Sequence, residues 1–162
     1  FAGAAALSAS GLPSDKFLFA GFLPNKDKKR EEILLWLKNI SITFILYESP
    51  KRVLKTLQSI EKILPNSPVV IAKELTKIHE EFIRGTARQI IGYFEKNPDK
   101  LKGEFVILCH PEEKKEINIE NLKEEIKNLK KEGFKSKEIA KIISEKFGIS
   151  KKEAYKLTLE EK

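Results

Sequence analysis

The chain has 162 residues, a formal net charge of +7 and 41% hydrophobic residues, which suits one medium-sized domain with a real core and at most a small appendage. No apolar run approaches the ~20 residues of a membrane-spanning helix, and the single cysteine, Cys109, excludes an intramolecular disulfide and fits a reducing compartment. We therefore expect a soluble, cytoplasmic protein with no membrane partner. Residues 1–13 have the pattern of the middle of a helix followed by a turn, so we also expect the chain to be part of a longer protein.

Most of the net positive charge lies in the first two thirds of the chain. Residues 111–162 contain 14 lysines and 12 glutamates, so +5 of the net charge of +7 lies in residues 1–110. A basic domain of this kind suggests a polyanionic partner such as nucleic acid. A proteome that is rich in lysine throughout would explain the same excess.

Residues 1–110 alternate between strand and helix patterns, as α/β domains do. The runs ITFILY (42–47) and VVIAKEL (69–75) are apolar, as strands buried on both faces are. EEFIRG (80–85) follows closely, so a hairpin is expected and the sheet should not be purely parallel. These patterns predict a mixed five-stranded sheet flanked by helices. The expected strands are 17–22, 42–47, 69–75, 80–85 and 104–109, and the expected helices are 27–39, 50–64 and 86–97.

The chain changes character after residue 110. Residues 111–118 are charged and predict a linker, and residues 119–162 predict a small helical domain in which Ser136 and Ser150 cap two short helices. The tripeptide Gly148-Ile149-Ser150 between these helices resembles a helix-turn-helix. A plain helical hairpin explains the same pattern, and the two interpretations stay open. The expected helices are 119–133, 136–147 and one that opens at Ser150.

Polar residues follow the strand 42–47 without a spacer. Ligands of open α/β sheets bind beyond the carboxyl ends of the strands, so Tyr47 and Glu48 are expected at a solvent-facing mouth, where Glu48→Gln should leave folding almost unchanged. Ser49 and Pro50 would form a turn that caps the next helix. The alternative is an ordinary helix start with solvated basic residues.

A second strand ends in the same way. The strand 69–75 runs into a charged segment that ends at Glu80 and contains His79. This histidine is a candidate general base, although a histidine in a charged loop is more often a surface residue. With one cysteine and two histidines the sequence predicts no metal site.

Four segments in order resemble signatures of the ribosomal RNA small subunit methyltransferase I family. They are ALSASGLPSDKFLFAGFLPNK, ILYESPKR, AKELTKIHEEFIRGT and GEFVIL, and they cover residues 6–108. The resemblance implies a 2′-O-ribose methyltransferase of the tetrapyrrole methylase fold, in which two α/β domains bind S-adenosylmethionine between them. The glycine-rich first domain is not in this chain, so we expect the chain to correspond to the second domain and to be inactive alone. The implied substrate is a cytidine of small-subunit (16S) ribosomal RNA on an assembled small ribosomal subunit, and the implied assembly is a homodimer.

The resemblance also implies roles for individual residues. Glu48, Glu74 and His79 are the candidates for the base that takes the 2′-hydroxyl proton, and the sequence does not choose between them. The side chains of Lys77, His79 and Arg84 would face the RNA, together with the basic loop 26–30. The implied cofactor-binding residues are Tyr47, Glu48, Ala72, Lys73, Glu74, Leu75 and Thr76, and the implied RNA-binding residues are Lys26, Arg30, Ser49, Lys51, Arg52, Lys77 and Arg84.

Two other functions fit the composition. A non-catalytic nucleic-acid-binding module would use the helical tail, but the lysines of the last helix are interspersed with glutamates. A tetrapyrrole methylase would share the fold, but the net positive charge and the Tyr-Glu-Ser-Pro-Lys-Arg segment favour RNA.

Overall fold

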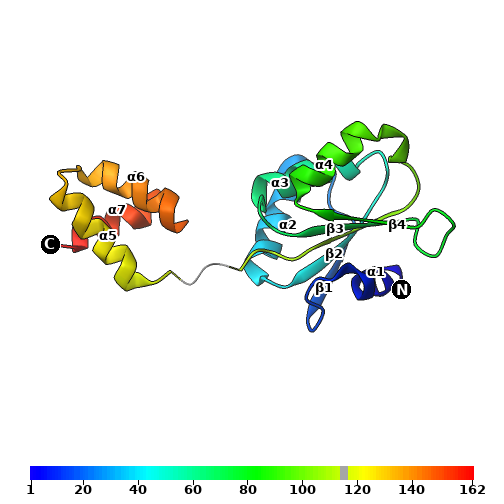
Figure 1. Ribbon diagram of the computed structural model, residues 1–162, viewed down its shortest axis with the longest axis horizontal. Helices are drawn as coiled ribbons and strands as arrows, with labels where there is room; N and C mark the ends of the chain where they lie inside the picture. Colours follow the sequence, from blue (N-terminus) through cyan, green and yellow to red (C-terminus); the bar gives the residue numbers. More distant parts are fainter. Residues whose placement is uncertain (114–116) are drawn as a thin grey trace. The chain divides into compact units, whose positions relative to one another are not determined.

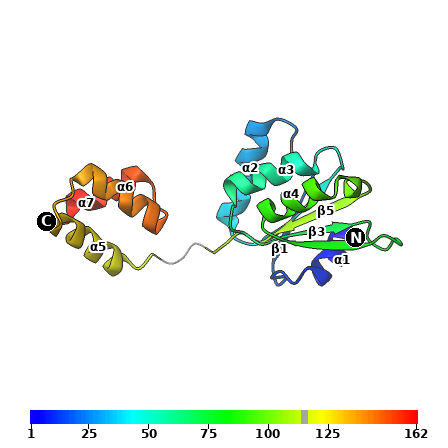
Figure 2. The ribbon, with the colours of Figure 1, turned by 45° about the horizontal axis from the view of Figure 1, so that its top comes forward.

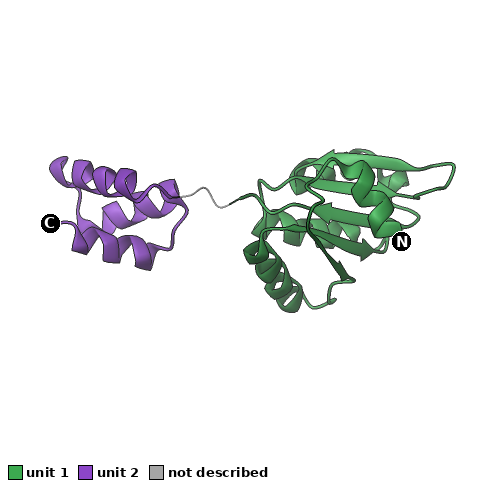
Figure 3. Ribbon diagram, turned by 90° about the horizontal axis from the view of Figure 1, so that it is seen from below, with its two compact units in different colours: residues 1–113 green, residues 114–162 purple. Residues whose placement is uncertain are grey.

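The computed structural model describes residues 1–113 and 117–162. The chain forms two compact units, Phe1–Glu113 and Lys114–Lys162, shown in green and purple in Figure 3. The linker expected over 111–118 includes residues 114–116, which lie outside the described residues.

The first unit is built on one mixed sheet of five strands in the order β1-β2-β5-β3-β4. β1 pairs in parallel with β2, and the other three pairs are antiparallel, including the hairpin of β3 and β4. The predicted mixed sheet and the predicted hairpin are therefore confirmed. The strands are β1 (Phe17–Gly21), β2 (Thr43–Glu48), β3 (Val69–Lys73), β4 (Glu81–Gly85) and β5 (Phe105–Cys109).

Helices cover both faces of this sheet (Figures 1 and 2). Three helices lie on one face, where residues such as Leu34, Leu57 and Phe94 pack against alternate residues of the strands. A single helix lies on the other face, where Ala6 and Leu7 pack against the remaining strand residues. The three helices are α2 (Asp27–Ile40), α3 (Val53–Ile63) and α4 (Ala87–Lys96), the single helix is α1 (Ala2–Ser10), and a 3-10 turn, η1 (Pro98–Lys100), follows α4.

Local chemistry explains where several elements begin and end. Thr86 caps α4 in a capping box with Gln89. β3 ends two residues earlier than expected, because Glu74 has φ 52° and Thr76 has φ 63°, so the backbone leaves the extended conformation there. α3 begins at Val53, after a turn that includes Pro50, and the hydroxyl of Ser49 makes no cap hydrogen bond.

The second unit contains three helices around a small core that includes Ile126, Ile139 and Ile143. Ser150 caps the last helix as expected, with its hydroxyl accepting the Glu153 N–H. Ser136 is not a cap, because Lys135 holds the N-cap position and its N–H donates to the Glu138 carboxylate. The helices are α5 (Ile119–Lys131), α6 (Ser136–Phe147) and α7 (Lys151–Glu160). Among the described residues, none of the helices has the length and apolar character that crossing a membrane requires.

Candidate functional site

The carboxyl ends of three strands meet at one edge of the sheet. β1 is parallel to β2, and both β2 and β3 run antiparallel to β5, so β1, β2 and β3 point the same way. Through this register Tyr47 pairs with Val106, and Val106 pairs with Ala72. The two polar strand ends of the sequence are therefore separated by a single strand.

Two adjoining depressions of about 450 Å³ each lie at this edge. They share Ala2, Glu104 and Val106, which places both on the face that α1 covers. We call the two together the edge groove. Its lining residues are Phe1, Ala2, Ala5, Phe22, Tyr47, Glu48, Ser49, Pro50, Leu75, Thr76, Lys77, Gly103, Glu104, Phe105 and Val106.

Tyr47 forms an aromatic wall of the edge groove. Its ring makes edge contacts with the ring of Phe19, at 4.9 Å between centroids, and with that of Phe22, at 6.0 Å. Phe22 is largely exposed. This part of the groove therefore presents aromatic surface of the kind that a flat ligand can contact.

Glu48 lies on the opposite face of the sheet from Tyr47, because neighbouring strand residues alternate between faces. Its side chain is only 1% exposed. One carboxylate oxygen accepts the Ser49 N–H at 2.9 Å and the other accepts the Thr56 hydroxyl at 2.7 Å. The expectation of a solvent-facing carboxylate was wrong, since Glu48 fixes the turn into α3 from inside.

Arg52 connects this turn to the loop after β1. Its Nε lies 3.4 Å from a Glu48 oxygen, and a guanidinium N–H donates to the Leu23 carbonyl at 2.5 Å. The arginine therefore holds the segment that carries Phe22 next to the segment that carries Tyr47. This structural bond leaves Arg52 only partly available to RNA.

Arg30 is buried, which contradicts its expected place on an RNA-facing surface. Its side chain is 3% exposed and donates to the Ser59 hydroxyl, to the Asn25 carbonyl and to the Asp27 carboxylate. Arg30 falls on the same helical stripe as Leu34 and therefore points into the unit. By contrast, Lys26 and Lys51 are exposed.

The segment after β3 has an unusual backbone. Glu74 and Thr76 both adopt the left-handed conformation, which is costly for residues other than glycine and occurs most often at functional sites. The Glu74 carboxylate accepts the Glu104 N–H at 2.6 Å, and Lys77 lies 3.4 Å from it. These donors hold the pKa of Glu74 below its usual value. Gly103 permits this contact, because a Cβ there would collide with the carboxylate.

The two residues before this segment do not line the edge groove. Ala72 is fully buried in the cluster beneath α1, so it offers no surface to a ligand there. The side chain of Lys73 lies on the face of α4 and lines a different cavity. The expected wall of the groove is thus formed by Leu75 and Thr76 instead.

His79 and Arg84 do not line the edge groove, whereas Lys77 does. His79 and Lys77 are exposed on the loop between β3 and β4. Two guanidinium N–H groups of Arg84 donate to the carbonyls of Ala9 and Ser10, which satisfies the carboxyl end of α1. The structure therefore gives Arg84 a helix-capping contact within the chain.

Glu81, at the start of β4, accepts hydrogen bonds from the Tyr93 hydroxyl at 2.5 Å and from Lys100 at 3.0 Å. Burial raises the pKa of Glu81, but these two donors outweigh burial and hold the pKa below its usual value of 4.5. The folded state therefore favours the ionised form of Glu81.

Replacing Glu81 by glutamine should lower the free energy of unfolding at pH 7 by about 1 kcal/mol. In a domain of this size, that loss lowers the melting temperature by a few degrees. The carboxylate stabilises the fold above about pH 4.5, and this contribution to the free energy of unfolding is lost as the pH falls through the lowered pKa that Glu81 has in the folded state. The difference in melting temperature between the variant and the wild type should therefore become smaller as the pH falls. Thermal melts between pH 7 and pH 3 test this, with the exposed Glu95→Gln as the matched control; a difference that persists at pH 3 would contradict it.

Sequence reasoning missed several residues of the edge groove. Phe22, Glu104 and Val106 line it, and the only signal for the last two was the segment GEFVIL at the start of β5. Glu104 and Val106 lie in the groove because β5 is inserted between β2 and β3.

The proteins with similar sequences are ribosomal RNA methyltransferases. "Ribosomal RNA small subunit methyltransferase I" of Synechocystis sp. is 37% identical over 160 residues, covering 96% of this chain and 57% of that protein. The protein of the same name from Bacillus subtilis is 34% identical over 157 residues, covering 93% of this chain and 53% of its own length. That of Erythrobacter litoralis is 48% identical over 107 residues, covering 66% and 37%.

The chain is a homologue of ribosomal RNA small subunit methyltransferase I, which confirms the resemblance seen in the sequence. It spans about half the length of the curated relatives that it matches. An alignment over 96% of the chain cannot leave out the second unit, so the helical tail belongs to the similarity as well. A scan against protein-family models finds no match.

Two solved structures are more distantly similar to this chain. A cobalt precorrin-4 methyltransferase of cobalamin biosynthesis aligns with a TM-score of 0.49 and 20% identity, covering 68% of this chain and 47% of that one. A uroporphyrin-III C-methyltransferase from Thermus thermophilus, solved with S-adenosyl homocysteine, aligns with a TM-score of 0.43 and 12% identity, covering 65% and 48%. The homology stated above rests on the sequence relatives alone.

Proposed function

We propose that this chain is the part of an S-adenosylmethionine-dependent methyltransferase that forms one wall of the cofactor site and faces the RNA. The reaction is methyl transfer to the ribose 2′-hydroxyl of a cytidine in small-subunit (16S) ribosomal RNA, on an assembled small subunit in the cytoplasm. The observation that carries the proposal is the edge groove, in which a depression with an aromatic wall at Tyr47 adjoins one lined by Leu75–Lys77, with Thr76 in the left-handed conformation. The sequence relatives supply the reaction class.

The residues of the groove suit a ligand with a flat ring and a polar tail. Tyr47 and Phe22 offer aromatic surface, and the backbone around Thr76 offers polar groups in a fixed, left-handed conformation. The sulfonium of the cofactor is already a strong electrophile, so alignment of the 2′-hydroxyl with the methyl group supplies most of the rate. Pre-formed walls of this kind contribute to that alignment.

Among the three candidates for the base, the geometry favours His79. Both oxygens of Glu48 are occupied and buried, so we propose that Glu48 positions the turn beside Tyr47. Glu74 has a lowered pKa and accepts internal donors, which makes it a poor proton acceptor. His79 is exposed on the loop next to this edge and makes no hydrogen bond or ion pair among the described residues.

The RNA-facing surface of the proposed enzyme lies at the amino ends of α2 and α3. Lys26 and Lys51 are exposed there and make no ion pair within residues 1–113 or 117–162, so they are available to phosphates. The homodimer remains part of the proposal, and sedimentation of the purified gene product tests it.

Replacing Tyr47 by alanine in the gene product that contains this chain should weaken S-adenosylmethionine binding up to about tenfold, because an aromatic contact contributes roughly 0.5–1.5 kcal/mol. Isothermal titration calorimetry measures the affinity, and Tyr155→Ala on α7 is the matched control because it removes an exposed tyrosine of the second unit. Equal affinities of the two variants would exclude the edge groove as the cofactor site. The chain alone should bind the cofactor more weakly than the whole gene product, because fewer contacts offset the same cost of ordering.

The reaction itself is tested with small ribosomal subunits as methyl acceptors. A 2′-O-methyl group removes the hydroxyl that attacks the neighbouring phosphodiester in alkali, so the methylated position should become resistant to alkaline cleavage. Methyl incorporation without such resistance would exclude ribose as the acceptor.

A further inference from the structure

The net positive charge of the second unit is confined to one segment. Residues 130–141 (KKEGFKSKEIAK) contain five lysines and two glutamates, a net charge of +3. The other described residues of this unit, 117–129 and 142–162, contain seven lysines and seven glutamates and are neutral together. The segment consists of the end of α5, the turn through Gly133 and the first half of α6. We call it the basic turn.

The lysines of the basic turn are not neutralised by ion pairs. Lys131, Lys135, Lys137 and Lys141 are exposed, and none of them makes an ion pair within the part of the chain that the structure describes. Lysines elsewhere in this unit do pair with glutamates; these are Lys123, Lys127, Lys146 and Lys156. The charge that remains available to a partner is therefore positive and lies in the basic turn.

The two glutamates of the basic turn are included in this net charge. The Glu138 carboxylate accepts the Lys135 N–H at 2.8 Å and so caps α6. Glu132 is exposed at the end of α5. Since five lysines stand against these two carboxylates, the segment still attracts polyanions.

An aromatic ring lies among these lysines. Gly133 has φ 92°, and the Phe134 N–H donates to the Leu129 carbonyl at 3.1 Å, which closes α5 and fixes the position of Phe134. Phe134 is 41% exposed. Proteins that bind single-stranded nucleic acid combine positive charge for the phosphates with aromatic rings on which bases stack.

We infer that the basic turn binds the phosphate backbone of the ribosomal RNA substrate and that a base of the same strand stacks on Phe134. The identity of this RNA rests on the proposed function. The contact adds a second RNA-binding surface to the one proposed at the amino ends of α2 and α3. Because lysines contact phosphates of any nucleotide, it would hold the RNA without reading its sequence.

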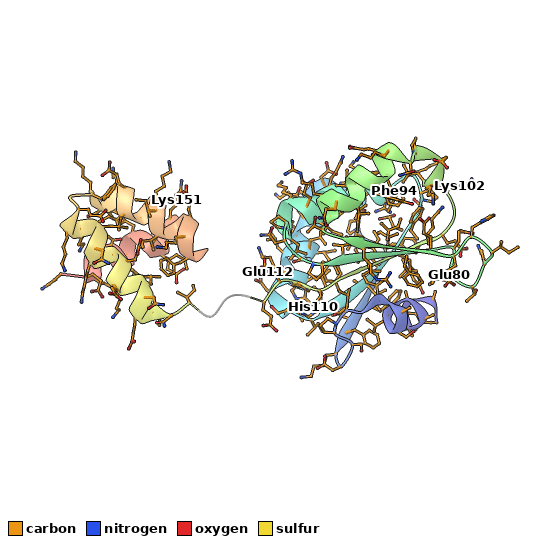
Figure 4. The ribbon with its side chains drawn as sticks, viewed as in Figure 1. Glu80, Phe94, Lys102, His110, Glu112 and Lys151 are labelled. Carbon is orange, nitrogen blue, oxygen red and sulfur yellow. The ribbon has the colours of Figure 1, made fainter. Side chains whose placement is uncertain are left out.

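The inferred contact is not the one that a helix-turn-helix would make, since there the second helix, α7, would enter a groove of the nucleic acid. Figure 4 shows Lys151 where α6 passes into α7, away from the turn between α5 and α6. The 12 residues of α6 separate the two places by about 18 Å. The two surfaces can therefore be tested separately.

Replacing Lys137 and Lys141 together by glutamine should weaken binding of a single-stranded fragment of small-subunit ribosomal RNA by the whole chain about tenfold. The slope of log affinity against log salt should fall by about 1.4, since each phosphate contact on a single strand contributes about 0.7. Fluorescence anisotropy at several salt concentrations measures both. The melting temperature should stay that of the wild type, because both lysines are exposed.

The matched control replaces Lys151 and Lys152 by glutamine. Both are exposed at the start of α7 and make no ion pair among the described residues, so the control removes the same charge and should leave the slope unchanged. Equal slopes for the two double variants would overturn the inference, and a lower slope of the control alone would assign the RNA contact to α7 instead. Retained RNA affinity of the Lys137/Lys141 variant with lost binding of polyglutamate would assign the basic turn to an acidic protein and would also overturn it.

The variant Phe134→Leu tests the stacking contact. It should weaken RNA binding about fivefold, the lower limit for the loss of one stacked base, and should leave the salt slope unchanged because no charge is removed. An unchanged affinity would overturn the role of Phe134. If the chain binds RNA through the basic turn but the whole gene product transfers no methyl group to small subunits, the inference stands and the proposed function fails.

Discussion

Replacing Glu48 by glutamine should lower the free energy of unfolding by about 2 kcal/mol, the usual contribution of a hydrogen bond to a buried charged group. The glutamine keeps the shape of the side chain but has only one acceptor oxygen, whereas the Ser49 N–H and the Thr56 hydroxyl each donate to a separate oxygen of Glu48. The nearby guanidinium of Arg52 also loses its opposite charge.

Urea denaturation of the first unit measures this change. Glu32→Gln is the matched control because Glu32 is exposed on α2, and surface changes of this kind usually cost under ~0.5 kcal/mol. If Glu48→Gln has the same midpoint as the control, Glu48 does not support the turn, and its role as a base in the reaction becomes open again.

Replacing Arg30 by methionine should destabilise the protein by about 3 kcal/mol, because it removes the hydrogen bonds of a buried guanidinium to the Ser59 hydroxyl and the Asn25 carbonyl, and a hydrogen bond to a charged group contributes about 1.5–3 kcal/mol. The Asn25 carbonyl loses a donor at 3.0 Å and the Ser59 hydroxyl one at 2.9 Å. Since Asn25 lies in the loop that follows Phe22, affinity for S-adenosylmethionine should fall together with stability.

Arg88→Met is the control for this change. The Arg88 side chain is 86% exposed and only approaches Glu61 at 3.9 Å, so its loss should cost under ~0.5 kcal/mol. Calorimetric melts of both variants decide the comparison. A melting temperature of Arg30→Met equal to that of the control would show that the network contributes no net stability.

The sequence pattern around Glu48 and that around Arg30 both indicate a buried position for the side chain. Phe44, Leu46 and Glu48 alternate along one strand, so Glu48 shares the face of the two apolar residues and not that of Tyr47. Arg30 precedes Leu34 by four residues and falls on the buried stripe of its helix. Periodicity predicted the strands and the helices, but the directions of Glu48 and Arg30 were predicted wrongly, because a charged side chain was expected to face solvent or a ligand.

Other features of the site could not be predicted in this way. The left-handed backbone at Glu74 is held by contacts with Glu104, which is 30 residues away. Such contacts arise from the order of the strands in the sheet, and no local pattern encodes that order.

The position of β5 has a consequence for the synthesis of the chain. It is the last strand to leave the ribosome, yet it lies between β2 and β3 and supplies the pairing partner of both. Until Phe105–Cys109 emerges, the nascent chain holds only two separate two-stranded ribbons, β1 with β2 and β3 with β4, and such ribbons are marginal in water. Their inner edges stay unpaired during that interval, so the backbone N–H and C=O groups of Thr43–Glu48 and Val69–Lys73 are open to intermolecular pairing until Phe105–Cys109 has left the ribosome.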